Sequence, residues 1–294
     1  MKFLFSLLFI IFSYVNLFSG QTTTLRFLKV FSNGVYSSQA RALTPFNETI
    51  KFFYNPAYNI DDRLITISYN NYNQDLKASF IGYSFNYKEK INYGIGFLDF
   101  DYGRLRQTFI DAIERPYYGN NLDGNAYVFL FNINFINQKI YNFGINAKFV
   151  RDKLFVKKAE VFLLDVGADI KLSDNYGLGL SIVNSGSKIK YYISEEAAPT
   201  SYLADFYYKK NKVLLNFGIE KYSRISELEK KISIEYELIK EIKIRCGYNS
   251  ASDVINNNLS YGFSFSYKNL VLDFSYSNYS AVGEENIITL NYRF

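Results

Sequence analysis

The stretch NIITLNYRF, residues 286–294, alternates apolar and polar side chains with a period of two. The apolar residues occupy every second position: Ile288, Leu290, Tyr292 and Phe294. In a pleated strand this spacing puts all four on one face. In a soluble domain the last residues of a chain usually fray into solvent. We therefore expect the apolar face of this strand to look outward into lipid.

The same alternation runs through most of the chain from Leu64 onward, for example in LITISYN (64–70), YNFGINAKF (141–149) and YGFSFSY (261–267). One face is aromatic or aliphatic, and the other is small, amidic or charged. Strands are predicted at 64–70, 77–87, 91–101, 125–136, 141–151, 159–172, 176–184, 200–208, 212–221, 230–237, 241–249, 258–267, 270–278 and 286–294.

Strand length and loop length both point to a membrane barrel. Most of these strands are about 9–11 residues long, which a tilted strand needs to cross a bilayer. Connections after even-numbered strands are short and those after odd-numbered strands are longer, notably 102–124 and 185–199. Outer-membrane barrels have short periplasmic turns and longer external loops. We predict an all-β fold, a transmembrane up-and-down antiparallel β-barrel of about fourteen strands, whose last strand closes on its first.

The first twenty residues, MKFLFSLLFIIFSYVNLFSG, have the layout of a secretory signal peptide, with one Lys and then an apolar run. We expect cleavage just before Gln21, and an uncleaved anchor is the alternative. Beyond Gln21 no apolar run of about 18 residues occurs, so a spanning structure must be a closed barrel. The expected location is the bacterial outer membrane.

Residues 21–63 do not follow the alternation and are punctuated by Pro45 and Pro56. We predict that this segment forms a plug inside the lumen of the barrel, and a periplasmic extension is the alternative. The predicted barrel is residues 64–294.

Composition argues against an enzyme. The 294 residues include 28 Tyr and 28 Phe but no His, which removes His-based catalysis and His-ligated zinc. The only cysteine, Cys246, lies on an apolar strand face. The net charge of +5 is dispersed, so no nucleic-acid surface is expected. No cofactor and no metal ion are expected.

Several short motifs have a structural interpretation. The G-x-G pairs at Gly94 and Gly96 and at Gly177 and Gly179 lie inside strands without the third glycine of a dinucleotide site, so they are predicted to be small lumen-facing residues. Charged lumen candidates that can pair across strands are Asp165, Asp169, Lys171, Glu220, Glu235, Lys243 and Arg245. Apolar inward candidates for a solute pocket are Leu98, Val128, Leu130, Leu203 and Tyr207.

Four stretches resemble the PorV/PorQ family of outer-membrane proteins, which is related to FadL-type transporters. FFYNPAYNI, with Asn55, Pro56 and Ala57, resembles the family's N-terminal motif. YGLGLSIVNSGSKIKY resembles its strand-and-loop motif, with Asn184 and Gly186, and Pro199 stands where the family has a Pro. IRCGYN, with Arg245, Gly247 and Tyr248, resembles the family's R-x-G-Y motif, and residues 271–294 resemble its terminal hairpin. The chain departs from the family in its reduced glycine content before Asn55 and in Tyr58, where the family has Gly.

The resemblance implies a fourteen-stranded barrel that binds rather than catalyses. PorV-like members act in type IX protein secretion, which implies secretion-system subunits and secreted cargo as partners, bound here by loops 102–124 and 185–199. FadL-like relatives transport hydrophobic small molecules, which is the alternative. The terminal Ile288, Leu290, Tyr292 and Phe294 resemble the signal read by the barrel-assembly machinery, and the outer-membrane bilayer is the remaining expected partner.

Overall fold

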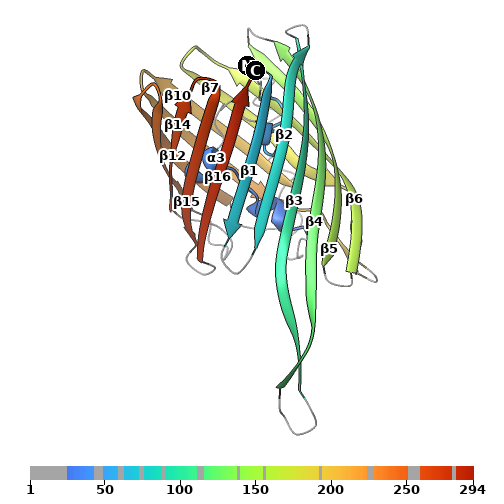
Figure 1. The fold of residues 1–294 in the computed structure, drawn as a ribbon. Coiled ribbons are helices and arrows are strands. Elements are labelled where there is room, and N and C mark those ends of the chain that lie inside the picture. The colour runs from blue at the N-terminus through green and yellow to red at the C-terminus, as the bar shows by residue number, and fades with distance from the viewer. Residues whose placement is uncertain are drawn as a thin grey trace.

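The computed structural model describes residues 25–42, 49–58, 63–72, 76–87, 90–110, 116–137, 140–154, 157–191, 194–223, 228–250, 259–279 and 283–294. Within these residues fourteen strands form a closed antiparallel barrel, and short helices lie inside it (Figure 1). The predicted signal peptide and its cleavage point lie outside the described residues.

Strand boundaries follow the alternating segments closely. The barrel strands are β1 (Leu64–Tyr72), β2 (Lys77–Tyr87), β3 (Ile91–Ile110), β4 (Pro116–Asn137), β5 (Tyr141–Leu154), β6 (Lys157–Lys171), β7 (Tyr176–Gly186), β10 (Ser201–Lys210), β11 (Val213–Tyr222), β12 (Leu228–Ile239), β13 (Ile242–Asn249), β14 (Leu259–Tyr267), β15 (Leu270–Tyr279) and β16 (Gly283–Arg293). Two short strands, β8 (Ile189–Tyr191) and β9 (Ser194–Glu196), pair with each other outside the barrel sheet.

Each barrel strand pairs with its neighbours in the chain, except that β7 pairs with β10 across the small β8–β9 hairpin. The barrel closes where β1 pairs with β16, with Leu64 opposite Arg293 and Tyr72 opposite Glu285. This closure leaves no free edge in the barrel sheet, which a wall surrounded by lipid requires. The predicted up-and-down barrel of about fourteen strands is confirmed.

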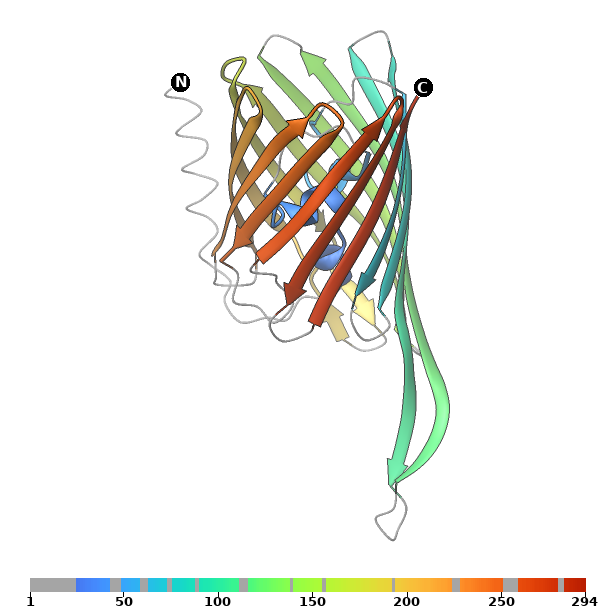
Figure 2. The same cartoon turned by 60° about the vertical axis from the view of Figure 1, so that its left-hand side comes forward.

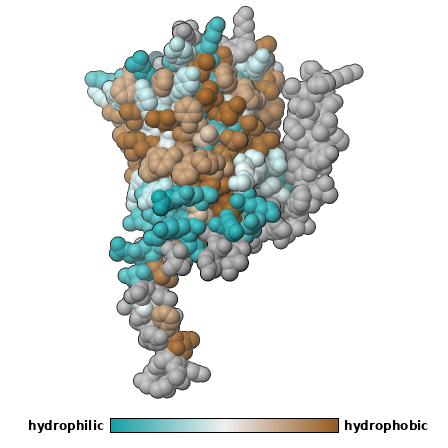
Figure 3. Space-filling view, turned by 90° about the vertical axis from the view of Figure 1, so that its right-hand side faces the viewer, coloured by the Kyte–Doolittle hydropathy of each residue, from teal (hydrophilic) through white to brown (hydrophobic). Residues whose placement is uncertain are grey.

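The period of two sorts the side chains between lipid and lumen. Ile81, Phe129 and Phe162 lie on the outer face and are 51%, 54% and 72% exposed. Inward neighbours such as Leu98 and Asn146 are fully buried. Figure 3 shows the result on one face of the barrel as a broad apolar band with a hydrophilic band beside it. The apolar band is the surface that faces the acyl chains of the bilayer.

The hairpin of β3 and β4 is longer than predicted. The sequence predicted that these strands end at residue 101 and begin again at 125, whereas β3 runs to Ile110 and β4 starts at Pro116. The two strands project well beyond the rest of the barrel (Figures 1 and 2). Their pairing shifts register between Asp101 and Arg104 and again between Arg106 and Thr108. Each shift breaks the period of two, which is why the extension was predicted as a loop.

The N-terminal segment, defined here as residues 25–42 and 49–58, contains α2 (Phe27–Val30), α3 (Gly34–Ser38) and the 3-10 helix η2 (Thr49–Phe53). Figure 2 shows these helices enclosed by the strands. Asn33 caps α3 by accepting a hydrogen bond from the backbone N–H of Tyr36 at 2.8 Å. None of the helices in the described part of the chain is long and apolar enough to cross a membrane.

Candidate functional site

The candidate site is the interface between the N-terminal segment and the inner wall of the barrel. Its first part is the turn at Asn55, Pro56 and Ala57. Asn55 Oδ1 accepts a hydrogen bond from the N–H of Ala57 at 3.0 Å, which closes the turn, and Asn55 Nδ2 donates to the carbonyl of Ala168 on β6 at 3.2 Å. Asn55 and Ala57 are fully buried. The motif therefore anchors the segment to the wall.

Side chains of β4, β5 and β7 bind a run of carbonyl groups in the segment. The five carbonyls belong to residues 52, 53, 54, 56 and 57. The donor–acceptor distances are 2.5 Å for Asn146 Nδ2 to Phe52 O, 3.4 Å for Lys148 Nζ to Phe53 O, 2.7 Å for Ser181 Oγ to Tyr54 O, 3.1 Å for Asn132 Nδ2 to Pro56 O and 2.9 Å for Asn134 Nδ2 to Ala57 O. The wall thus satisfies backbone acceptors that would otherwise be buried without partners.

A buried ion pair lies at the centre of this interface. Lys148 Nζ is 2.7 Å from Asp165 Oδ2, and both side chains are 0% exposed. Asp165 Oδ1 accepts from the backbone N–H of Asn184 at 2.6 Å, and Asn184 Oδ1 accepts from Lys148 at 2.9 Å. Three strands and the N-terminal segment therefore share one polar cluster, since Lys148 also reaches the carbonyl of Phe53.

The predicted loop motif lies next to this cluster. Asn184 adopts a positive φ of 57° near an irregularity in the pairing of β6 with β7. Its carbonyl accepts from Thr200 Oγ1 at 3.0 Å, which brings it close to the buried Pro199. Gly186 lies at the end of β7 opposite Leu163. The structure thus brings Asn184 and the residue after Pro199 together, and Gly186 takes no part in the polar cluster.

Wall glycines leave room for the segment. A Cβ added at Gly144 would lie 2.1 Å from the carbonyl oxygen of Pro56, and one added at Gly167 would lie 2.1 Å from Asn55 Oδ1. Of the four predicted lumen-facing glycines, Gly94 and Gly179 pack against Phe52 and Tyr58 of the segment. Only glycine permits this close approach of backbone to backbone or side chain.

The opposite wall holds α3 and the residues after it. The N–H of Gly34 donates to Thr289 Oγ1 at 3.0 Å, and Ser37 Oγ donates to Glu285 Oε2 at 3.0 Å. Arg41 lies 4.0 Å from Glu285. Contacts on both sides of the lumen therefore fix the segment.

Tyr36 and Tyr54 stack inside the segment with ring centroids 3.7 Å apart. Burial raises the pKa of both hydroxyl groups above the ordinary value. Both tyrosines are therefore neutral at physiological pH, and Tyr54 donates to the carbonyl of Phe31 at 2.7 Å.

The inward apolar residues predicted to line a solute pocket are all buried: Leu98, Val128, Leu130, Leu203 and Tyr207. All except Tyr207 belong to one apolar cluster together with Phe27, Phe31, Phe52 and Phe53 of the N-terminal segment. The space beside them is therefore filled by the segment. A cavity of about 20 Å³, room for roughly one water molecule, remains between the segment and β7, β10 and β11.

The charged lumen candidates pair only in part as predicted. Glu235 pairs across strands with Arg245 at 2.7 Å and with Lys243 at 3.1 Å. Glu220 pairs with Lys231, at 2.5 Å, a residue the sequence did not single out. Asp165 pairs with Lys148, which was also missed.

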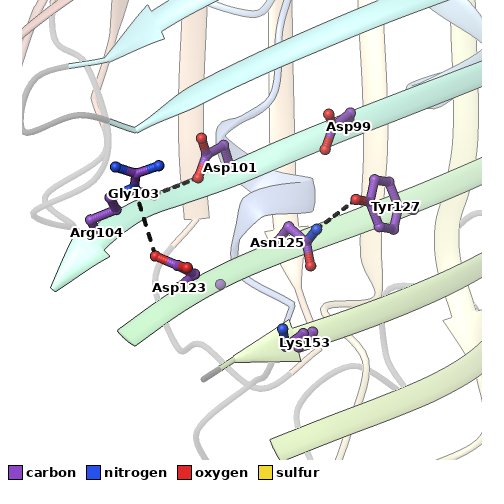
Figure 4. Close-up of a pocket in the computed structure, with 9 residues that line it drawn as sticks. Asp99, Asp101, Gly103, Arg104, Asp123, Asn125, Tyr127 and Lys153 are labelled. Carbon is purple, nitrogen blue, oxygen red and sulfur yellow. Dashed lines mark hydrogen bonds and ion pairs between the residues drawn. The ribbon is translucent and has the colours of Figure 1, made fainter. Parts of the chain in front are cut away.

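A second, polar pocket of about 230 Å³ lies on the outer side of the wall at the base of the β3–β4 hairpin (Figure 4). Asp99 and Asp101 of β3 face Asn125 of β4 and Lys153 of β5 there. Arg104 lies 3.8 Å from Asp123. No group of three or more His, Cys, Asp or Glu side chains in the described part of the chain is arranged to hold a metal ion.

The C-terminal residues lie on the lipid side of the closing strand. The outward, exposed positions are Ile288, Leu290, Tyr292 and Phe294. Tyr292 and Phe294 meet edge to face with ring centroids 4.9 Å apart, and the N–H of Phe294 donates to the carbonyl of Arg63 at 3.0 Å. Their part as a barrel-assembly signal stays a prediction.

Sequence reasoning missed the wall side chains that bind the segment: Asn132, Asn134, Asn146, Lys148 and Ser181. The signal was the repeated Asn at inward positions in FNINF (131–135) and GINAK (144–148). An inward Asn that faces water and one that binds a carbonyl give the same pattern, so the sequence could not separate them.

No family model and no curated protein match the chain, so the resemblance to PorV/PorQ proteins stays a prediction. Solved structures do match. The Pseudomonas putida toluene transporter TodX is similar with a TM-score of 0.64 and 10% identity, over 92% of this chain and 98% of TodX. A Pseudomonas aeruginosa FadL homologue gives 0.59 and 12% identity, over 90% and 98%. The chain therefore has the fold of the FadL-type transporters of the bacterial outer membrane.

Proposed function

We propose that this protein transports hydrophobic small molecules across the outer membrane and that the N-terminal segment closes the lumen as a plug. The observation that carries the proposal is the segment itself, seated inside a barrel that resembles FadL-type transporters. A purely structural barrel has no need for an inner segment bound so specifically.

The mode of attachment suits a movable plug. Side chains of the wall, and not a β-ladder, bind the carbonyls of residues 52–57. A hydrogen bond of this kind contributes about 0.5–1.5 kcal/mol net to stability, because water replaces the partner that is lost. The plug can therefore move or refold without opening the backbone ladders that close the barrel.

The chemistry of the lumen favours an apolar solute. On the side of β3 and β4 the wall presents Leu98, Val128 and Leu130, and the plug presents aromatic rings to them. Movement of the plug would expose an apolar path along this side of the lumen. TodX is described as a transporter of toluene, and a solute of that class matches such a path.

A disulfide lock tests the proposal. Ser37 Oγ of the plug and Ser277 Oγ of β15 are 3.0 Å apart, so a Ser37→Cys/Ser277→Cys pair in a Cys246→Ser background can tie the plug to the wall. We expect the oxidised protein in vesicles to block uptake of a radiolabelled aromatic hydrocarbon or fatty acid, and reduction to restore uptake.

A matched control ties wall to wall. Asn216 and Ser233 are opposite each other on β11 and β12, with their side chains 2.9 Å apart, so Asn216→Cys/Ser233→Cys in the same background leaves the plug untouched. Its uptake should not depend on oxidation. If the reduced proteins take up solute no faster than empty vesicles, transport is the wrong function. If the oxidised lock transports normally, the plug does not gate.

A role in protein secretion is the second candidate, as the resemblance to PorV proteins implies. The projecting hairpin of β3 and β4 favours it, because it presents an external surface on a rigid scaffold, where binding residues concentrate. The solved structures that resemble this chain support the transporter proposal more strongly. Partners would be secretion-system subunits and secreted cargo.

Removal of residues 104–123 separates the two candidates. Each protein is purified in mild detergent, and the proteins that copurify are identified by mass spectrometry. A secretion partner should copurify with the full-length protein and should be absent from the deletion variant. Solute uptake should be unchanged by the same deletion. Copurified lipid or fatty acid with no protein partner would exclude the secretion role.

A further inference from the structure

The turn end of the barrel carries an excess of positive charge. Short turns face the periplasm in outer-membrane barrels, which orients this end. Its described, solvent-exposed basic residues are Arg63, Lys90, Lys171, Lys209, Lys210, Lys212, Lys240 and Lys268. The acidic residues described at the same end are few: Asp174, Glu237 and Glu241. We call this set of basic residues the basic ring.

The opposite end carries exposed lysines as well, among them Lys153, Lys157, Lys158 and Lys190, and three of its exposed basic residues are paired with carboxylates. Arg104 lies 3.8 Å from Asp123, Arg151 lies 3.5 Å from Glu160, and Lys188 lies 3.9 Å from Glu195. In the described part of the chain no ion pair with an acidic side chain neutralises Lys90, Lys210, Lys240 or Lys268. Among the described residues, both ends therefore carry exposed lysines, and fewer acidic residues accompany them at the turn end.

The basic ring lies directly beyond a band of lipid-facing tyrosines. These are exposed on the outer face near the strand ends: Tyr87, Tyr141, Tyr176, Tyr236, Tyr267 and Tyr292. Such aromatic bands mark the boundary between acyl chains and headgroups. Lys268 follows Tyr267 in the chain, and its Nζ lies 5.3 Å from the centre of the Tyr267 ring. The lysines thus stand at the depth of the headgroup phosphates.

Lys268 occupies a backbone position that Gly or Asn usually fills. Its φ is 52°, in the left-handed region that costs a residue with a Cβ about 1 kcal/mol. An earlier turn, between β10 and β11, has Asn211 at the same φ of 52°. Turn geometry by itself therefore does not favour a lysine at this position.

We propose that the basic ring binds the phosphate groups of anionic phospholipids in the periplasmic leaflet of the outer membrane. A basic residue near an anionic membrane surface contributes about fivefold to affinity, which corresponds to about 1 kcal/mol. The ring would select phosphatidylglycerol over neutral phospholipids around the barrel and fix its vertical position in the bilayer. This inference does not depend on what the barrel transports.

Quenching by brominated lipids provides the test, because the chain contains no Trp. The fluorescence of a Tyr267→Trp variant is quenched by brominated lipids beside the basic ring. The fluorescence of a Phe162→Trp variant is quenched by brominated lipids near the opposite end. The protein is placed in vesicles of neutral phosphatidylcholine with brominated phosphatidylglycerol or brominated phosphatidylcholine. At the first reporter we expect phosphatidylglycerol to bind about three- to fivefold more strongly, and at the second we expect a smaller ratio, because more carboxylates accompany the basic residues at that end.

Charge removal identifies the residues responsible. Lys240→Gln/Lys268→Asn should bring the ratio at the Tyr267→Trp reporter close to one, and Asn also suits the left-handed turn position. The matched variant Lys153→Gln/Lys158→Gln removes two exposed lysines at the loop end and should leave that ratio unchanged. Retention of the folded, heat-modifiable band shows that each variant is intact.

Three outcomes overturn the proposal. The first is equal quenching by the two lipids at the Tyr267→Trp reporter. The second is a preference that survives in Lys240→Gln/Lys268→Asn. The third is a preference of the same size at both reporters, which would mean that the basic ring does not bind anionic lipid more strongly than the opposite end does. High salt should weaken the preference, because the interacting charges are exposed.

Discussion

Single side chains of the wall bind the N-terminal segment, the proposed plug, in one position. Lys148 and Asp165 are both removed from water, and such a pair stabilises only when its remaining donors and acceptors are also satisfied. Here Asn184 and the carbonyl of Phe53 satisfy them. The main effect of the pair is therefore to fix one position of the N-terminal segment. Its net contribution to stability is small, because burying both charges costs free energy.

Removal of one charge from this pair should be costly. We expect Lys148→Met to lower the free energy of unfolding by about 3–5 kcal/mol, because it leaves a buried carboxylate without its cation. The double variant Lys148→Met/Asp165→Asn should show a smaller loss of unfolding free energy, because it leaves no unpaired charge. Denaturant unfolding in detergent, followed by the heat-modifiable band, measures both.

An exposed ion pair gives the control. Arg151 and Glu160 are more than half exposed, so Arg151→Met should cost no more than about 1 kcal/mol. A single Lys148→Met variant as stable as this control would show that the buried pair does not hold the plug.

Gly144 tests the close approach of plug and wall. An added Cβ would meet the carbonyl oxygen of Pro56 at 2.1 Å, so Gly144→Ala should displace the plug. Trypsin should then cut after Lys51, which is 1% exposed in the intact protein. Mass spectrometry of the fragments detects the cut. Ala147→Val adds volume on the lipid side of the same strand and should leave Lys51 protected; equal protection in both variants would contradict this packing.

At the scale of elements, the alternation predicted the strands well because lipid and lumen impose opposite chemistry on successive residues. The prediction failed where bulges shift the parity, at Asp101 to Thr108 in the β3–β4 hairpin. It also missed β8 and β9 inside the expected loop 185–199, since strands of three residues carry no measurable period.

The closing strand β16 provides a prediction about assembly. If its terminal residues are read by the barrel-assembly machinery, Phe294→Ala should reduce the amount of folded protein in the outer membrane of cells several-fold. Refolding of the purified variant in detergent should remain normal, because Phe294 is 64% exposed and packs little. Phe263→Ala, at a lipid-facing position of β14, is the control. A similar loss in both variants would mean that the effect is stability and not recognition.

At the scale of the whole molecule, the N-terminal segment occupies the lumen, and a cavity of about 20 Å³ lies between it and β7, β10 and β11. We expect the intact protein to show little ion conductance in a planar bilayer. Deletion of residues 25–58 should open a steady conducting pore, since polar side chains line much of the wall.

The deletion of the β3–β4 extension, residues 104–123, is the control and should leave the bilayer closed. Both proteins must first show the heat-modifiable band of a folded barrel. A deletion of residues 25–58 that folds and still does not conduct would show that the wall itself, and not the plug, closes the lumen.

The sequence by itself determined the all-β class, the number and limits of most strands, and which face of each strand meets lipid. These follow from a local rule, because side chains alternate along a pleated strand whatever lies elsewhere in the chain. The sequence left open whether the N-terminal segment lies in the lumen or extends into the periplasm. Only the tertiary structure decided that residues 25–42 and 49–58 lie in the lumen and that Asn132, Asn146 and Lys148 bind carbonyls of this segment. These contacts join residues 76 to 95 positions apart, and their geometry depends on the width and register of the closed barrel, which no local pattern encodes.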